Sequence, residues 1–584
     1  HPHRLHPARY QAMSETAVRH SSLDEMLSDR HADLRSPEVV MAPTQLGAAR
    51  LTRYSFTRTL LRRAARDGWR SRLVDFDMDA EGRGHAVYRT DIDGRQFDFV
   101  AFTTTLDESL HTDRVIAPAW EVSGALVEGA VDDAYLARLR ESVPLQEAAR
   151  LDPRVLVLTR GNRSVRFYDY LVDRLAGGLQ PEVDKVADAG YILRSTAFYG
   201  NGKFGMRSYP GLFGEHPLQA PYRAQLLCAW LFRELGYEQV EHCARARGGD
   251  SAARFDGDWR NYFGLGNATG LGLVPYAFKH PRILNAWAGV RELALANVRT
   301  LPGTPERLAA LRRWTDRAVA HFSALGGDDR PPWLGPASLA VRARLVATQL
   351  NEMADGPAPF DALFRWAESH DVETCELVVS LLIELDEGLA DDEVDRLLTV
   401  DEEVEVDPLA TVDTLRRLLT ERYGWLDDLD LDSPAGRHFW WVVSDNSDEP
   451  RRCERTALDP GHHEVAIDVA HRLLDLRRTL DELPGDTAAG MLLADHPGHG
   501  NAVKRLLGSD QPYGEPRDNA CAAGFLPLEL QRFQLAMYGM DNFSPKSTDW
   551  LRVTLFQGAP RIDDLSPTTT DDWVWPQRPT EESP

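Results

Sequence analysis

Residues 71–102 constrain the fold of this chain more than any other segment. They alternate β-branched or aromatic residues with polar ones over consecutive runs, which the turn pairs Glu81-Gly82 and Asp93-Gly94 separate. This alternation is typical of strands that bury one face, and the short spacing favours antiparallel hairpins. A further extended run at residues 114–129 predicts a meander of three or four strands. We expect helices to pack against its apolar face.

The pattern changes from strand-like to helical along the chain. Residues 154–161 are typical of a strand, residues 190–209 of a strand or hairpin, and residues 222–237 of a buried helix. From Pro281 to about Met540 the spacing is helical almost throughout, including a helix at 438–443 that runs into a polar turn. The run Trp550–Gly558 is a late strand, which must pair with a sheet formed elsewhere. The predicted fold class is α+β: an N-terminal antiparallel β-meander with helices, followed by a large, predominantly α-helical region.

These patterns divide the chain into six regions. We expect a flexible N-terminal tail at 1–40, a β-meander domain at 41–150, a central α/β region with ligand loops at 151–300, a helical region at 301–430, a helical C-terminal region with one late strand at 431–565, and a flexible tail at 566–584. The acidic run Asp391–Asp407 is interpreted as a solvated face and linker, because blocks of like charge repel one another and stay hydrated.

Charge and composition exclude several classes of function. The net charge of −24 argues against nucleic acid or an anionic membrane as a partner, because phosphate binding requires a basic surface. No apolar run approaches the ~20 residues that span a bilayer. The five cysteines lie far apart, without CxxC spacing, which argues against a disulfide framework and against a thiolate zinc site. We therefore expect a cytoplasmic protein whose anionic ligands are bound in a local cationic pocket.

Lysine is rare in this chain. Five of the 66 basic residues are lysine and the rest are arginine, a bias typical of a bacterial genome of high GC content. The remaining lysines include candidates for positions that need a compact, titratable amine. Lys203 and Lys279 both fall in segments rich in glycine and aromatic residues.

The first candidate ligand segment is Tyr199–Arg207. Three glycines within six positions would let backbone N–H groups approach a ligand closely, and Lys203 and Arg207 add positive charge. Such a segment suits a carboxylate or a phosphate. It matches neither a Walker loop nor a dinucleotide fingerprint, and a tight hairpin with incidental charges is the alternative.

The second candidate segment is Trp259–Pro281, which mixes glycines, amides, phenols and two titratable bases just before a helix. A helix start attracts anions, which adds to the case for a ligand. The alternative is a buried loop whose glycines serve packing. The candidate residues here are Asn261, Tyr262, Asn267, Thr269, Lys279 and His280.

A third pattern is a stripe of possible metal ligands. Glu464, Asp468 and His471 are spaced at i, i+4 and i+7 within the segment His462–His471. Carboxylate and imidazole groups on one stripe suit a transition metal. A polar stripe beside an apolar seam is also usual on any surface helix, and HExxH spacing is absent, so we predict no metal.

Together these features predict an enzyme that acts on a small, anionic metabolite by acid/base proton transfer, of the lyase or isomerase kind. Lys203 and Arg207 would hold the carboxylate or phosphate, with both rare lysines facing one pocket. The alternatives are a non-catalytic helical interaction protein with an acidic surface, and a metal-dependent enzyme that uses the His462–His471 stripe. The cofactor is unknown, and a homo-oligomer is left open. The candidate catalytic residues are Tyr199, Lys203, Lys279 and His280, and the candidate substrate-binding residues are Asn201, Arg207, Asn261, Tyr262, Asn267 and Thr269.

Overall fold

The computed structural model describes most of the chain. The described residues are 25–28, 30, 33–111, 119–145, 152–186, 190–200, 216–267, 281–325, 336–353, 358–398, 406–428, 438–442, 451–455, 466–508, 513, 527–547 and 550–580. The chain separates into two compact units. Unit 1 comprises residues 1–49, 271–296 and 396–534, and unit 2 comprises residues 50–270, 297–395 and 535–584.

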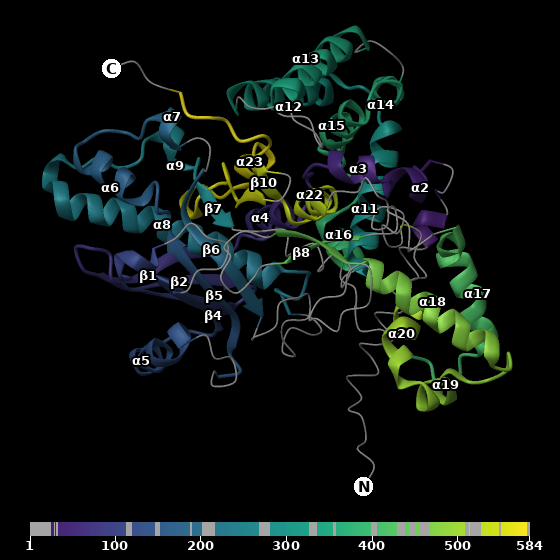
Figure 1. Cartoon of the computed structure of the whole chain (residues 1–584). Coiled ribbons are helices and arrows are strands. Elements are labelled where there is room, and N and C mark those ends of the chain that lie inside the picture. The colour runs from purple at the N-terminus through teal and green to yellow at the C-terminus, as the bar shows by residue number, and fades with distance from the viewer. Residues whose placement is uncertain are drawn as a thin grey trace. The chain divides into compact units, whose positions relative to one another are not determined.

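Unit 2 is built on a nine-stranded sheet (Figure 1). Its strand order is β1-β2-β3-β4-β5-β6-β7-β11-β10, so the last two strands come from the C-terminal part of the chain. The strands are β1 (Arg70–Met78), β2 (Gly84–Ile92), β3 (Arg95–Thr103), β4 (Val122–Glu128), β5 (Val155–Arg163), β6 (Tyr191–Gly200), β7 (Gly264–Asn267), β10 (Met540–Ser547) and β11 (Trp550–Leu555). The predicted α+β class is confirmed.

The predicted antiparallel meander is also confirmed. β1 pairs with β2, and β2 pairs with β3, in antiparallel register. Asp93 and Gly94 both have positive φ, 50° and 77°, as a tight hairpin turn between right-twisted strands requires. The wider β1–β2 turn places Gly82 at φ 73°.

Helices pack on both faces of this sheet. On one face, Phe232 of α8 (Arg223–Gly248) meets Phe99 of β3 edge to face, with 6.3 Å between ring centroids. On the same face Gly161 has room for no side chain, because a Cβ there would lie 2.9 Å from the Phe232 ring. The residues of α5 (Asp133–Ser142) lie in one apolar core with β2–β5 residues such as Val100 and Leu158.

The other helices of unit 2 surround this core. They are α4 (Phe56–Arg66), α6 (Tyr168–Ala176), α7 (Val183–Val186), α9 (Gly257–Arg260), α12 (Pro305–Leu325), α13 (Pro336–Met353), α14 (Pro359–Glu368), α15 (Val372–Ile383), α16 (Asp391–Leu398), which extends past Asp395 into unit 1, and α23 (Pro567–Asp571). Short 3-10 turns occur at Glu108–Leu110, Val143–Leu145, Gly249–Ser251 and Ile562–Asp564.

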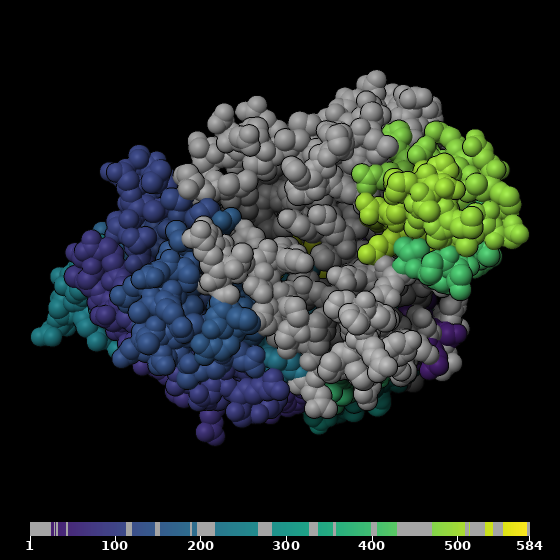
Figure 2. Space-filling model, turned by 90° about the horizontal axis from the view of Figure 1, so that it is seen from below, coloured from purple at the N-terminus to yellow at the C-terminus, as the bar shows by residue number. Residues whose placement is uncertain are grey.

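Unit 1 is mainly helical in its described part. It contains α2 (Pro37–Val40), α3 (Pro43–Ala48), α17 (Val412–Tyr423), α18 (Ala466–Glu482), α19 (Ala489–Asp495), α20 (Gly500–Gly508) and most of α11 (Pro281–Arg299) and α22 (Pro527–Tyr538). It also contains 3-10 turns at Gly424–Asp428 and Pro497–His499. Helices α17, α18 and α20 contact one another and form the green cluster of Figure 2. Glu292 of α11 is buried against Arg35, with 2.7 Å between Oε1 and Nη2.

Two expectations for the C-terminal half need correction, and a third is met with an addition. Residues 438–442, expected as a helix, form strand β8, which pairs with β9 (Arg451–Arg455). The late strand does pair with a sheet formed elsewhere, because β11 joins β7, but β10 accompanies it. The expected flexible tail at 566–584 is ordered as far as residue 580 and buries Trp573 and Trp575.

The C-terminal segment is attached to unit 2 through polar contacts as well as apolar ones. The Trp573 indole N–H donates to the carbonyl of Gln557 at 2.8 Å. Nδ1 of His321, on α12, donates to the carbonyl of Pro576 at 2.7 Å. Burial of His321 lowers the pKa of its imidazole from 6.5 to about 4. The neutral ring is therefore the form that holds the segment.

This histidine predicts a specific loss of stability in acid. The folded pKa lies below the unfolded one, so the contribution is complete above pH ~6.5 and is lost as the pH falls towards ~4, by about 3 kcal/mol. Denaturant unfolding at pH 7 and pH 4.5 should show a smaller pH dependence for His321→Asn than for the wild type. Equal pH dependence in both proteins would contradict this role for His321.

Candidate functional site

The candidate site is located by one pair of neighbouring strands. β6 and β7 are parallel, whereas the other neighbouring strands described in the nine-stranded sheet are antiparallel. The carboxyl ends of parallel strands point to the same edge of a sheet, and ligands often bind beyond such ends. Both candidate segments of the sequence include residues of these strands: Tyr199–Arg207 begins on β6, and Trp259–Pro281 contains β7. The remainder of each segment, with Lys203 in the first and Thr269 in the second, follows its strand along the chain.

The end of β7 lies level with the start of β4. Asn267 is paired with Ser195 of β6, Ser195 with Gly161 of β5, and Gly161 with Val122 of β4. These four positions form one row across the sheet, which we call the β7 row. Neighbouring strands are about 4.8 Å apart, so the row is about 14 Å long. The row therefore runs from the end of β7 to the start of β4 across the full width of β5 and β6.

A cation lies beside the β7 row. Arg160 of β5 precedes Gly161, and its guanidinium carbon lies 3.8 Å from the centroid of the Trp120 ring. The backbone carbonyl of Arg160 accepts a hydrogen bond of 3.4 Å from the Ser195 hydroxyl. Stacking on an aromatic ring holds a guanidinium in one orientation through a cation–π interaction. This arrangement suits recognition of a carboxylate or a phosphate.

A carboxylate and an imidazole meet at the β4 end of the row. Glu121 precedes Val122 and is only 5% exposed. One of its oxygens, Oε2, accepts a hydrogen bond of 2.9 Å from the backbone N–H of Arg163, and Oε1 lies 3.7 Å from Nε2 of His111. The side-chain oxygen of Asn162 accepts from the Glu121 N–H at 2.8 Å, which holds the start of β4 in place. A buried carboxylate next to an exposed imidazole is suited to proton transfer.

β7 is held in place by a buried arginine on α8. Nε of Arg233 donates to the carbonyl of Phe263 at 2.7 Å, and Nη2 donates to the carbonyls of Asn261 and Ala559 at 2.9 and 2.8 Å. Its Nη1 pairs with Glu234 at 3.0 Å. One side chain therefore connects α8, the residues just before β7 and the segment just after β11.

The neighbours of Arg233 complete a closed polar network. Glu234 also accepts from Nε of Arg561 at 2.8 Å, and Arg561 continues to Glu238 at 3.0 Å. The Tyr237 hydroxyl donates to the carbonyl of Phe263 at 3.0 Å. Burial raises the pKa of Tyr237 to about 12, so its phenol remains protonated. These groups are committed to structure rather than to a ligand.

The glycines of β7 serve packing. A Cβ on Gly266 would lie 2.5 Å from Cγ of Tyr191 on β6, and a Cβ on Gly264 would overlap the carbonyl oxygen of Leu555 on β11. Glycine at these positions therefore allows β7 to fit between its two neighbours. This supports the packing interpretation for Gly264 and Gly266.

Of the predicted site residues, Asn261 and Tyr262 are fully described. Asn261 ends α9, and its buried side-chain oxygen finds no hydrogen-bond donor in the described part of the chain. The Tyr262 ring is buried and lies 5.5 Å from the ring centroids of both Trp259 and Phe263, so it belongs to an aromatic core.

The other predicted residues are described in part or not at all. The backbone of Tyr199 lies on β6 opposite Leu158, and that of Asn267 ends β7. The joint pocket for the two rare lysines stays a prediction. Asn201, Lys203, Arg207, Thr269, Lys279 and His280 lie outside the described residues.

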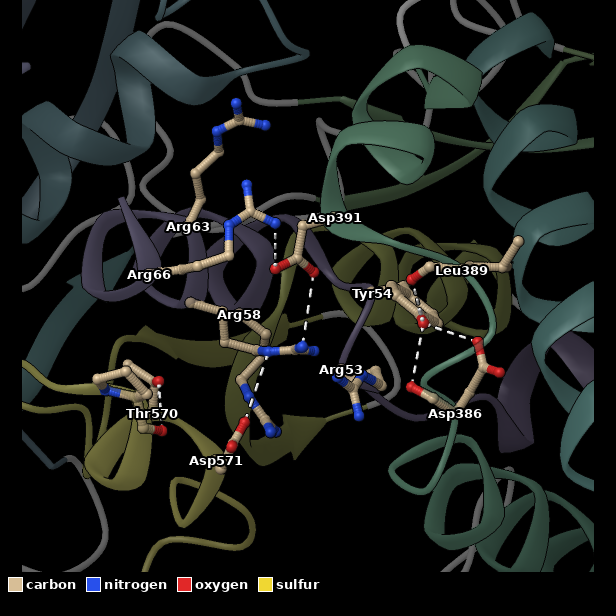
Figure 3. Close-up of polar contacts among 12 residues, drawn as sticks. Arg53, Tyr54, Arg58, Arg63, Arg66, Asp386, Leu389, Asp391, Thr570 and Asp571 are labelled. Carbon is tan, nitrogen blue, oxygen red and sulfur yellow. Dashed lines mark hydrogen bonds and ion pairs between the residues drawn. The ribbon is translucent and has the colours of Figure 1, made fainter. Parts of the chain in front are cut away.

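The densest charge cluster of unit 2 is structural (Figure 3). It joins α4 to the segment Glu384–Asp395: Arg58 pairs with Glu384 at 3.0 Å and Arg66 with Asp391 at 3.1 Å. The Tyr54 hydroxyl donates to Asp386 at 2.7 Å, and burial is the main reason that the pKa of Tyr54 is raised. The expectation that the acidic run from Asp391 is solvated is wrong at its start, because the arginines of α4 neutralise it.

The possible metal stripe is only partly described. Glu464 lies outside the described residues, and Asp468 is described by its backbone alone. Farther along unit 1, His499 has its Nε2 at 2.8 Å from the Thr479 hydroxyl. Across the described ranges, no three His, Cys, Asp or Glu side chains come together as a metal site requires.

Comparison with known proteins does not assign the chain to a family. No protein-family model, no curated protein and no solved structure matches the chain. None of the helices that the structure describes is long and apolar enough to cross a membrane.

The packing of β7 predicts that an added methyl group destabilises the protein at Gly266 but not at Gly257. Gly266→Ala should lower the melting temperature and the hydrogen-exchange protection of β6, because its Cβ would press on the buried Tyr191 ring; a cost of about 1–3 kcal/mol is expected. Gly257→Ala is the control, since a Cβ there meets nothing within 4 Å. Equal stability of the two variants would show that β7 has room for side chains.

Proposed function

We propose that the protein is an enzyme that binds a small carboxylate or phosphate at the β7 row and acts on it by proton transfer, as a lyase or isomerase does. The observation that carries the proposal is the alignment of Asn267, Ser195, Gly161 and Val122 in one row. The row places Arg160 beside Gly161 and the Glu121–His111 pair beside Val122, level with the end of β7 in the sheet.

Arg160 has the binding role in this proposal. A guanidinium that is stacked on Trp120 loses little freedom when it binds, so more of its interaction with an anion appears as affinity. Lys203 and Arg207, on the segment after β6, add the further positive charge that a divalent anion needs. In a chain of net charge −24, this local excess of cations supplies the attraction that the surface as a whole lacks.

Glu121 and His111 have the proton-transfer role. The N–H of Arg163 stabilises the Glu121 carboxylate through Oε2, which leaves Oε1 facing His111. An acid and a base at adjacent positions can remove a proton from one atom of a substrate and return it to another. Tyr199, Lys279 and His280 remain further candidates for the same step, with Asn267 orienting the substrate.

The rival function is that of a non-catalytic partner-binding protein with an acidic surface. The ion pairs that the acidic run forms with arginines of this chain argue against it. The first residues of the run pair with arginines of α4 and α8: Asp391 with Arg66 of α4, and Asp395 with Arg63 of α4 and Arg223 of α8. Carboxylates that are already paired contribute little to attracting a basic partner.

A thermal-shift screen against small carboxylates and phosphates tests the binding step. A true ligand at about 100 times its dissociation constant should stabilise the protein by ~2.7 kcal/mol. Lys203→Ala should remove most of that shift while leaving the melting temperature of the free protein nearly unchanged. Lys185→Ala is the matched control, because Lys185 is an exposed lysine of unit 2 that pairs with Glu182 at 3.0 Å. Equal loss of the shift in both variants would count against a site after β6.

Glu121→Gln separates chemistry from binding. Glutamine keeps an acceptor for the Arg163 N–H but cannot take up a proton, so kcat should fall by about 10²–10⁴ while the ligand-induced thermal shift remains. Asn162→Ala, which disturbs only the support of β4, should cost far less activity. A Glu121→Gln enzyme with normal kcat would rule out this carboxylate as the acid or base.

A further inference from the structure

A depression on α12, separate from the β7 row, has three arginines among its six lining residues. It is open to solvent and has a volume of about 580 Å³. The helical spacing of its α12 residues brings them to one side of the helix. Ala309 has a short side chain and therefore leaves space above the helix backbone. The lining residues are Ala309, Arg312, Arg313, Asp316, Arg317 and Gln577.

Two of these arginines are oriented by uncharged acceptors. Nε of Arg312 donates to the side-chain oxygen of Asn351 on α13 at 3.1 Å. Nη1 of Arg317 donates to the backbone carbonyl of Asp572. Neither guanidinium forms an ion pair with a carboxylate in the described part of the chain, so both charges are held in position but not neutralised. Arg313 differs, because it lies 3.5 Å from the Asp572 carboxylate.

The arginines of the depression differ from those of α4. The arginines of α4 are surrounded by carboxylates: Arg63 alone faces Asp67, Asp392 and Asp395. At the depression, three guanidinium groups share its rim with one lining carboxylate, Asp316. Positioned, unneutralised guanidinium groups around a hollow are the arrangement that binds a multivalent oxyanion.

We propose that the α12 depression is a binding site for a phosphate group, with Arg312 and Arg317 as its donors. Arg312 and Arg317 are five positions apart, about 140° around the helix axis, so they approach the hollow from two edges. A phosphate between them presents oxygen atoms to both edges, and its charge is attracted by both cations. Asp316 opposes the anion and limits its affinity. The site is independent of the β7 row, since none of its lining residues belongs to the nine-stranded sheet.

Titration of the full-length protein with inorganic phosphate at constant ionic strength tests the proposal, with isothermal calorimetry as the readout. Arg312→Gln should weaken binding about tenfold, by loss of a charge-assisted hydrogen bond. Asp316→Asn should strengthen binding roughly threefold, by removal of a nearby negative charge. Arg307→Gln is the matched control. Arg307 lies on the same helix and is likewise oriented by an uncharged acceptor, the carbonyl of Pro302 at 3.3 Å, but it does not line the depression.

The outcomes distinguish the α12 depression from the segment after β6. Phosphate affinity that is the same in the wild type, Arg312→Gln and Asp316→Asn would overturn the proposal, as would the absence of saturable binding. The Lys203→Ala variant should bind phosphate at the depression as the wild type does. If Lys203→Ala abolishes the binding and Arg312→Gln preserves it, the phosphate occupies the segment after β6, and the α12 site is wrong.

Discussion

The guanidinium of Arg233 is the contact on which the arrangement of the β7 row depends. A buried cation is costly unless its charge and its N–H groups are all compensated. Here one carboxylate, Glu234, balances the charge, and the carbonyls of Asn261, Phe263, Ala559 and Pro560 accept the other four N–H groups. A lysine could not replace it, because an ammonium has three donors and lacks the planar fork that reaches several carbonyls in different directions. α8 thereby fixes both segments that flank the β7–β11 pair.

That pairing makes the sheet a long-range structure. Leu265 of β7 is paired with Leu555 of β11, 290 positions later in the chain, so β7 acquires its second neighbour only when the C-terminal segment has joined unit 2. Contacts of such large sequence separation are slow to form, because the chain between them must first be confined. The β7 row therefore depends on the complete fold, although most of its residues come from β4, β5 and β6. The buried Trp573 and Trp575 help to keep the C-terminal segment in place.

Local patterns in the sequence were sufficient for the elements that form from neighbouring residues. The meander β1–β3 and the buried helix α8 follow from alternation, turn pairs and helical spacing. β7 was missed because its four residues, Gly264–Asn267, include two glycines and have no strand propensity of their own; tertiary packing makes them a strand. The acidic run was misjudged for a related reason. Asp391 is neutralised by Arg66, which lies 325 positions earlier, and a local count of charges cannot detect that partner.

The candidate site shows the same contrast between what local sequence patterns indicate and what only long-range packing determines. Rarity and composition drew attention to the lysines and glycines, whereas Arg160, Trp120 and Glu121 look ordinary in the sequence. Their significance comes from register: a shift of one residue between β4 and β5 would turn alternate side chains to the opposite face and separate Arg160 from Trp120. The one available signal was that Thr159 and Arg160 end a buried apolar run, where a polar residue needs a partner. At β7, Gly264, Gly266 and Arg233 fix the fit of that strand against β6 and β11. The β7 row therefore depends on residues that have no part in the proposed chemistry.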